Sequence, residues 1–151
     1  MKMYVYVPVF FVLFLASSVG AANFPLQTSL GTEVGNGWHM QSSVMVSKDG
    51  RVEGETTLKA CQVAGFYGAV WAALYDAQGL ILHITKTNRY GLDGSGIDCN
   101  TRSVTWHEDT GLNKYALSQV DGVFLYQAHS PRGTWLDPWM LGRLITEHVA
   151  N

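Results

Sequence analysis

Residues 61–99 read CQVAGFYGAVWAALYDAQGLILHITKTNRYGLDGSGIDC, and they decide the fold. They hold a long hydrophobic run, a turn signal, a glycine-rich polar loop and, at the two ends, the only two cysteines of the chain. We predict that Cys61 and Cys99 form a disulfide, because two cysteines in an exported chain most simply pair with each other. The alternatives are free thiols or an intermolecular bridge. Closing this loop would stabilise the fold by about 4 kcal/mol in the chain-entropy model.

The hydrophobic run within this stretch, FYGAVWAALY at 66–75, is compatible with either a helix or a strand. Its aromatic residues recur at helical spacing. Gly65, Gly68 and Val70 favour a strand, as does the turn signal at 76–79 that leads into a β-rich segment. We predict a strand with two largely apolar faces. Such a strand is either central and covered on both sides or exposes an aromatic binding surface.

The other strands are predicted from residues that alternate between apolar and polar. An Asp-Gly pair at 49–50 is a strong hairpin signal, and we expect a type I′ turn there, with positive φ at both residues. The segments predicted as strands are 38–47, 51–58, 80–87, 102–108 and 122–129.

The chain ends differ in character. Residues 24–37 show no clear period and are predicted to be an arm or loop. A short helical turn is expected around 115–120. Asp137 and Pro138 give an N-cap and a first-turn proline, which predict a helix over 138–149. These elements together predict a mainly β domain, an antiparallel β-sandwich or flattened barrel of about six to seven strands with a C-terminal α-helix.

Residues 1–22 have the layout of a secretory signal peptide, with an early positive charge, an apolar run and small residues at the end. A membrane anchor is the alternative, but the run is short for the roughly 20 residues that cross a bilayer. We therefore predict that residues 23–151 form a single secreted domain.

The charge balance is mildly acidic, with a formal net charge of -2 and no run of lysine or arginine. Nucleic-acid binding domains carry a basic patch or stripe, which this chain lacks. The composition also argues against a polybasic surface that binds membranes. We expect membrane association only if the N-terminal segment stays uncleaved.

The motifs whose spacing carries a catalytic mechanism are absent from the sequence. The best catalytic candidates are His107 and Glu108, because an imidazole beside acids can act as a general base. Consecutive residues of a strand point to opposite faces, however, so a solvated strand end is the alternative. The histidines are scattered, at positions 39, 83, 107, 129 and 148, with no pair at the spacing of metal ligands.

The glycine-rich segment 88–101 is predicted to be one long loop. Asp93, Ser95 and Asp98 offer oxygen ligands of the kind that calcium prefers. Their spacing does not match the calcium loop of an EF-hand, and the alternative is a turn in which the aspartates bond to nearby backbone N–H groups.

Aromatic residues provide the strongest indication of a ligand surface. As a strand, 66–75 would align Tyr67, Trp71 and Tyr75 on one face, and flat rings with a polar tip suit a sugar face or a protein hot spot. Core packing is the alternative. Tyr90 and Asp93 of the 88–101 loop are the predicted neighbours of this face. Trp135 and Trp139 flank the predicted helix start and are expected to seal it onto the sheet.

The first hypothesis is a secreted non-enzymatic binding module that recognises a protein or glycan through the aromatic strand face and the 88–101 loop. A small secreted hydrolase or metal-dependent enzyme is the second, and an exported toxin-like or inhibitor protein is the third.

Overall fold

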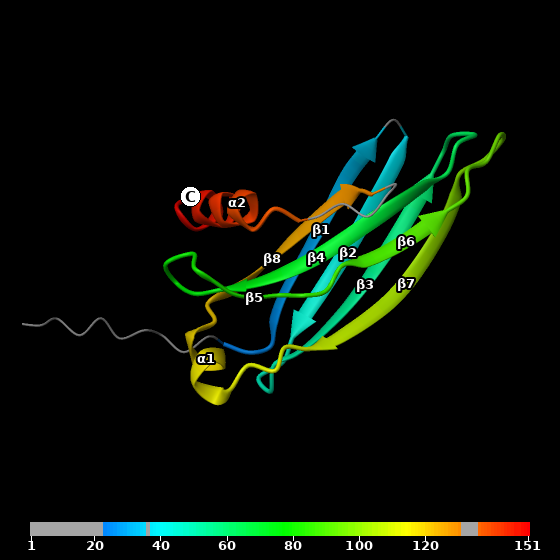
Figure 1. Ribbon diagram of the computed structural model, residues 1–151. Coiled ribbons are helices and arrows are strands. Elements are labelled where there is room, and N and C mark those ends of the chain that lie inside the picture. The colour runs from blue at the N-terminus through cyan, green and yellow to red at the C-terminus, as the bar shows by residue number, and fades with distance from the viewer. Residues whose placement is uncertain (1–22, 36, 131–135) are drawn as a thin grey trace, which may run out of the picture.

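The computed structural model describes residues 23–35, 37–130 and 136–151, which form two packed antiparallel sheets and two helices (Figure 1). The first sheet has the strand order β1-β2-β3-β7, and the second is built around β4. The strands of the first sheet are β1 (Leu26–Gly35), β2 (Trp38–Val46), β3 (Arg51–Ala60) and β7 (Asn100–Asp109). Those of the second are β4 (Phe66–Tyr75), β5 (Ile81–Ile84), β6 (Asn88–Leu92) and β8 (Gly122–His129). The predicted sandwich is confirmed.

The central strand β4 is paired along both edges. One edge pairs with β8 over Gly68 to Tyr75. Along the other edge, β6 pairs with the first half of β4 and β5 pairs with the second half. The segment that connects β5 to β6 therefore lies between two strands that share this edge. Thr85 holds this segment against β4, because its N–H donates to the Ala72 carbonyl and its hydroxyl accepts from the Ala72 N–H, each at 2.9 Å.

Residues 66–75 are thus a strand, as predicted, and β4 is buried on both faces. Val70 and Leu74 point into the space between the sheets, where they join the main core. Ala73 and Tyr75 point the other way and pack against Leu141 of α2 (Pro138–Val149). The continuous hydrophobicity of this strand therefore reflects its central position.

Strands β2 and β3 confirm the predicted alternation, with buried residues on the core side and exposed residues on the other side. The turn between them is not type I′. Gly50 has a φ of +86°, whereas no non-glycine residue in the described segments has a positive φ, so Asp49 does not adopt the conformation that we expected. A single glycine in the left-handed region is sufficient to close this turn.

A chain of polar groups crosses the core and links the sheets. The Gln127 Nε2 on β8 donates to the Ser42 Oγ at 2.6 Å. The Ser42 and Thr56 hydroxyls bond to each other at 2.9 Å. Thr56 also accepts from the Trp106 indole N–H at 3.2 Å. The indole lies flat over Gly54, where an added Cβ would collide with the ring. These bonds give partners to the Ser42 and Thr56 hydroxyls, whose burial would otherwise be costly, whereas the buried Gln127 Oε1 has no partner among the described residues.

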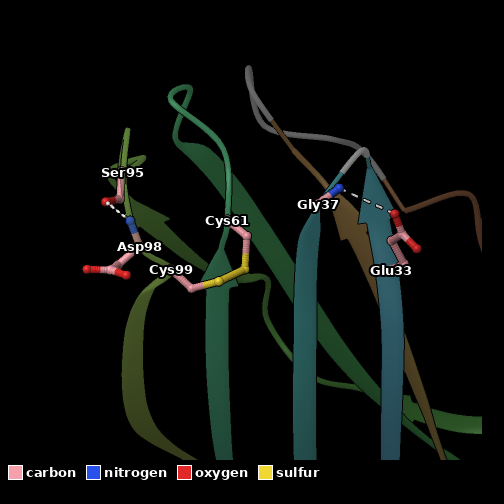
Figure 2. The surroundings of a disulfide bond; sticks show 6 residues. All are labelled: Glu33, Gly37, Cys61, Ser95, Asp98 and Cys99. Carbon is pink, nitrogen blue, oxygen red and sulfur yellow. Dashed lines mark hydrogen bonds between the residues drawn. A yellow bond between two sulfur atoms is a disulfide. The ribbon is translucent and has the colours of Figure 1, made fainter.

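The predicted disulfide between Cys61 and Cys99 is present (Figure 2). It lies in the first sheet, immediately after the last β3–β7 pair, Ala60 with Asn100. The bridge therefore fastens the ends of two neighbouring strands.

Two segments predicted to be loops are strands. Leu26–Gly35 forms β1 and pairs with β2. Its inward positions are partly buried, and they include Leu30, which packs against the core. In the segment 88–101, Asn88–Leu92 forms β6 and Asn100 begins β7, which leaves a loop of residues 93–99. Tyr90 and Leu92 pack against the core and hold β6 in place.

The two helices cover different parts of the sandwich. The short helix α1 (Lys114–Gln119) begins after the N-cap Asn113, near the predicted position, and buries Leu117. Helix α2 has the predicted bounds, and the Asp137 Oδ1 accepts from the Trp139 N–H at 3.0 Å. In the described part of the chain, no helix is long and apolar enough to cross a membrane. The predicted signal peptide, residues 1–22, and Trp135 lie outside the described residues.

Candidate functional site

The predicted aromatic face of β4 is not a continuous exposed surface. Tyr67 is 48% exposed, whereas Trp71 is 2% and Tyr75 is 7% exposed. The Trp71 indole N–H donates to the Thr87 hydroxyl at 2.8 Å, and its ring lies 5.7 Å from that of Tyr126. Trp71 and Tyr75 are therefore packing residues, and only Tyr67 remains at the surface.

Tyr67 is held against β6 on the outer side of the second sheet. Its ring lies under the Arg89 guanidinium, 4.1 Å from the ring centroid, and it also packs on Gly91, where an added Cβ would come within 2.8 Å of the ring. Tyr90 faces the core, since it pairs with the inward-facing Gly68. The predicted ligand-binding residues Tyr67 and Tyr90 thus lie on opposite faces of the sheet, and Asp93 is exposed in the loop beyond β6.

The predicted calcium ligands lie in the 93–99 loop. Hydrogen bonds between side chains and backbone groups hold this loop in shape. The Ser95 hydroxyl accepts from the Asp98 N–H at 3.3 Å (Figure 2). The Asn100 side chain donates to the Asp93 and Gly94 carbonyls at 3.0 and 3.1 Å. No cluster of three or more His, Cys, Asp or Glu residues suited to a metal ion occurs within the described ranges.

The candidate catalytic residues His107 and Glu108 point to opposite faces of β7. Glu108 points inward, where its Oε1 lies 3.0 Å from the His83 Nε2 and its Oε2 accepts from the Lys86 N–H at 2.8 Å. This carboxylate therefore joins the first sheet to the second. His83 was not expected as its partner, because the two residues belong to different sheets and nothing local in the sequence relates them.

His107 points outward into a hollow of about 690 Å³. The hollow lies on the outer face of the first sheet. The side chains that face it come from all four strands of that sheet, and they are Gln27, Ser29, Ser43, Met45, Arg51, Glu53, Glu55, Thr105 and His107.

Strand register places these side chains in two rows across the sheet. One row runs Gln27, Met45, Glu53, His107, and the next runs Ser29, Ser43, Glu55, Thr105. Glu53 and Glu55 are two residues apart on β3, so they share a face with their Cα atoms about 7 Å apart.

The outer face is polar. The Arg51 Nε forms an ion pair with the Glu53 Oε1 at 3.0 Å, and both side chains are exposed. The hollow thus combines carboxylates, hydroxyls, an amide, a guanidinium and an imidazole with the apolar side chain of Met45. A second recess of about 370 Å³ continues along the same face beside His39, Thr57 and Lys59. The outer face therefore offers an elongated surface of hydrogen-bonding groups.

The fold and the hollow together define a disulfide-bonded antiparallel β-sandwich with one open, polar sheet face. No family model matches the chain, and no curated protein or solved structure is detectably similar to it.

Proposed function

We propose that the protein is a secreted, non-enzymatic binding module that holds a glycan against the outer face of its first sheet. The observation that carries this proposal is the hollow of about 690 Å³, in which side chains from four strands converge. The layout of residues 1–22 supports export, and a disulfide is typical of proteins in oxidising compartments.

The chemistry of the hollow suits a polyhydroxylated ligand. Carboxylates accept hydrogen bonds from sugar hydroxyls, whereas serine and threonine hydroxyls and the glutamine amide both donate and accept. Charge-assisted bonds to Glu53, Glu55 and Arg51 would be the strongest of these contacts.

The frame of the hollow is rigid. All four strands are joined by antiparallel pairing, and the disulfide fastens β3 to β7 at one end. A binding site built on strands is positioned more accurately than one built on loops. The second recess would extend the contact to further units of an elongated glycan.

A glycan array followed by titration calorimetry tests the proposal. We expect binding to a restricted set of glycans. Replacing Glu55 with alanine should weaken that binding by about tenfold or more, which corresponds to the loss of one or two hydrogen bonds to a charged group. Glu147→Ala, an exposed glutamate change on α2, is the matched control and should bind as the wild type does. Binding to no glycan, or equal binding by both variants, would overturn the proposal.

A small hydrolase is a second candidate, because Glu53 and Glu55 place two carboxylates on the same face of β3. A pair of carboxyl groups, one acting as acid and the other as base or nucleophile, is the catalytic apparatus of most glycosidases. Incubation with the bound glycan and chromatography of the products distinguishes the two functions. Shortened products that vanish with Glu55→Gln would identify the hydrolase, whereas an intact glycan supports the binding module.

A further inference from the structure

A separate recess lies at the end of the molecule where the β4–β5 turn meets α2 (Figure 1). We call it the apolar groove, and its volume is about 520 Å³. Leu80 and Trp139 line it, and they are 63% and 89% exposed. Trp139 therefore does not seal α2 onto the sheet, contrary to the expectation from the sequence. Neighbouring exposed apolar side chains that include a tryptophan are typical of an interaction surface.

Both walls of the apolar groove are firmly held. The Asp76 Oδ1 accepts from the backbone N–H groups of Gln78 and Leu80 at 2.9 and 2.8 Å, which fixes the turn. Leu141 and Ile145 on the opposite side of α2 are fully buried against the sheet. The exposure of Leu80 and Trp139 is thus a property of the fold, and little order would be lost on binding.

Gly142 keeps the apolar groove open. It lies three residues after Trp139, on the stripe of α2 that lines the groove. Glycine is a poor residue for a helix interior, and nothing in the local geometry requires it. Its φ is not positive, and an added Cβ would have no atom within 4 Å. The missing side chain leaves room for an occupant.

Among the residues that line the apolar groove, Arg143 is the one that carries a charge. Arg143 follows Gly142, and no carboxylate is among the residues that line the groove. The Arg143 Nε is 3.9 Å from the Glu147 Oε1, an exposed contact at the limit for an ion pair. A fitting occupant therefore carries an apolar side chain next to an acidic one.

The opposite end of the same chain presents this combination. Ile97 is 95% exposed, and the next residue is the exposed Asp98. Both lie in residues 93–99, which we call the tip loop. The Ser95 N–H donates to the Gln62 carbonyl at 2.8 Å, and the disulfide at Cys99 fixes the end of the loop (Figure 2). The tip loop thus holds an aliphatic side chain in solvent on a braced backbone.

We propose that the apolar groove of one molecule receives the tip loop of a second copy, with Ile97 between Leu80 and Trp139 and Asp98 beside Arg143. The two surfaces lie at opposite ends of the sandwich, so the tip loop of one molecule cannot reach the apolar groove of the same molecule (Figure 1). The contact is head-to-tail, and such contacts propagate into open chains or close into rings. One loop in one groove is a small interface, so the association is weak and dependent on concentration.

Sedimentation velocity tests this assembly without any ligand, so the result is independent of the proposed glycan binding. We expect the average mass to rise with chain concentration between about 1 µM and about 1 mM, the range for weak contacts. Ile97→Ser and Gly142→Leu should each stay monomeric. Tyr115→Ser removes an exposed aromatic residue elsewhere, on α1, and should associate as the wild type does.

Mixing the two defective variants gives the sharpest result. Ile97→Ser retains the groove and Gly142→Leu retains the tip loop, so an equimolar mixture should form one-to-one dimers and nothing larger. Circular dichroism establishes that both variants are folded. A wild type that stays monomeric at the highest concentration would overturn the proposal. Unchanged association of Ile97→Ser, or a mixture of folded variants that stays monomeric, would do the same.

Discussion

The two sheets of this sandwich are covered differently. The second sheet is buried on both faces, because the first sheet covers one side and α2 covers part of the other. The first sheet packs on one side only, and its outer residues are exposed. The hydrophobicity of each strand follows from this difference, since β4 is apolar throughout whereas β2 and β3 alternate.

The comparison shows where a ligand surface is to be sought. The sequence predicts a ligand surface from the aromatic residues of β4, but Trp71 and Tyr75 are buried and pack against their neighbours. The hollow lies instead on the sheet whose outer residues resemble an ordinary solvated surface. In this fold, the doubly covered sheet supplies stability and the singly covered sheet leaves room for binding.

Trp71→Ala should have the largest effect on stability, because it removes a fully buried ring and the hydrogen bond to Thr87. We expect a loss of about 5 kcal/mol in the free energy of unfolding, at the upper end for a buried tryptophan. Urea denaturation followed by fluorescence or circular dichroism measures it. Ser43→Ala, on the open face of the first sheet, is the control and should change stability by about 0.5 kcal/mol or less. Similar losses in both variants would show that the two sheets are not covered differently.

The two faces of one strand can be compared with neighbouring residues of β7. Glu108→Ala removes the inward carboxylate that accepts from His83 and from the Lys86 N–H. We expect it to cost about 2 kcal/mol, within the range for hydrogen bonds to a partly buried charged group.

His107→Ala, the next residue on the outward face, should leave stability almost unchanged while weakening glycan binding. Chemical denaturation and calorimetry on both variants measure the two properties. If His107→Ala destabilised the fold and Glu108→Ala did not, the orientation of β7 would be wrong.

The sequence predicts well those elements whose pattern is local. Strand β8 has the predicted bounds, and so does α2, because Asp137 and Pro138 mark its start. The pairing of Cys61 with Cys99 was predictable from the cysteine count alone. The two elements depend on residues that are close in sequence, and two cysteines allow only one intramolecular pairing.

The missed strands lack a strong local pattern. In β1, threonines at 28 and 32 take inward positions between the aliphatic residues, which weakens the apolar alternation. In β6, a glycine and polar residues surround Tyr90, so the segment resembles the loop that follows it. Pairing with β2 and with β4 decides these two elements, and pairing partners are not visible in a single strand.

The hollow could not be predicted for a related reason. The alternation of Glu53 and Glu55 correctly indicates a solvated strand face, and that is all that β3 shows by itself. The recess exists because register brings Ser29, Ser43 and Thr105 beside these glutamates. A binding surface spread over four strands depends on long-range pairing that follows from the fold.

The smallest predicted effect is a loss of stability at alkaline pH that originates in the second sheet. Burial raises the pKa of Tyr75 above its ordinary value of about 10, and the nearby Asp121 carboxylate raises it further. Burial also raises the pKa of Tyr90, which Arg102 partly offsets. Both tyrosines belong to the second sheet, whereas the described strands of the first contain none.

A phenol whose pKa is raised by folding stabilises the protein fully below its unfolded pKa, and this contribution is lost as pH rises through the folded pKa. We therefore expect the urea midpoint to fall between about pH 10 and about pH 12. Tyr75→Phe should reduce that fall relative to the wild type, because phenylalanine has no proton to lose. The comparison between the two proteins cancels the titration of lysines, which they share. An identical alkaline fall in both would mean that Tyr75 is as well solvated in the folded protein as in the unfolded chain, and that α2 does not cover this part of the second sheet.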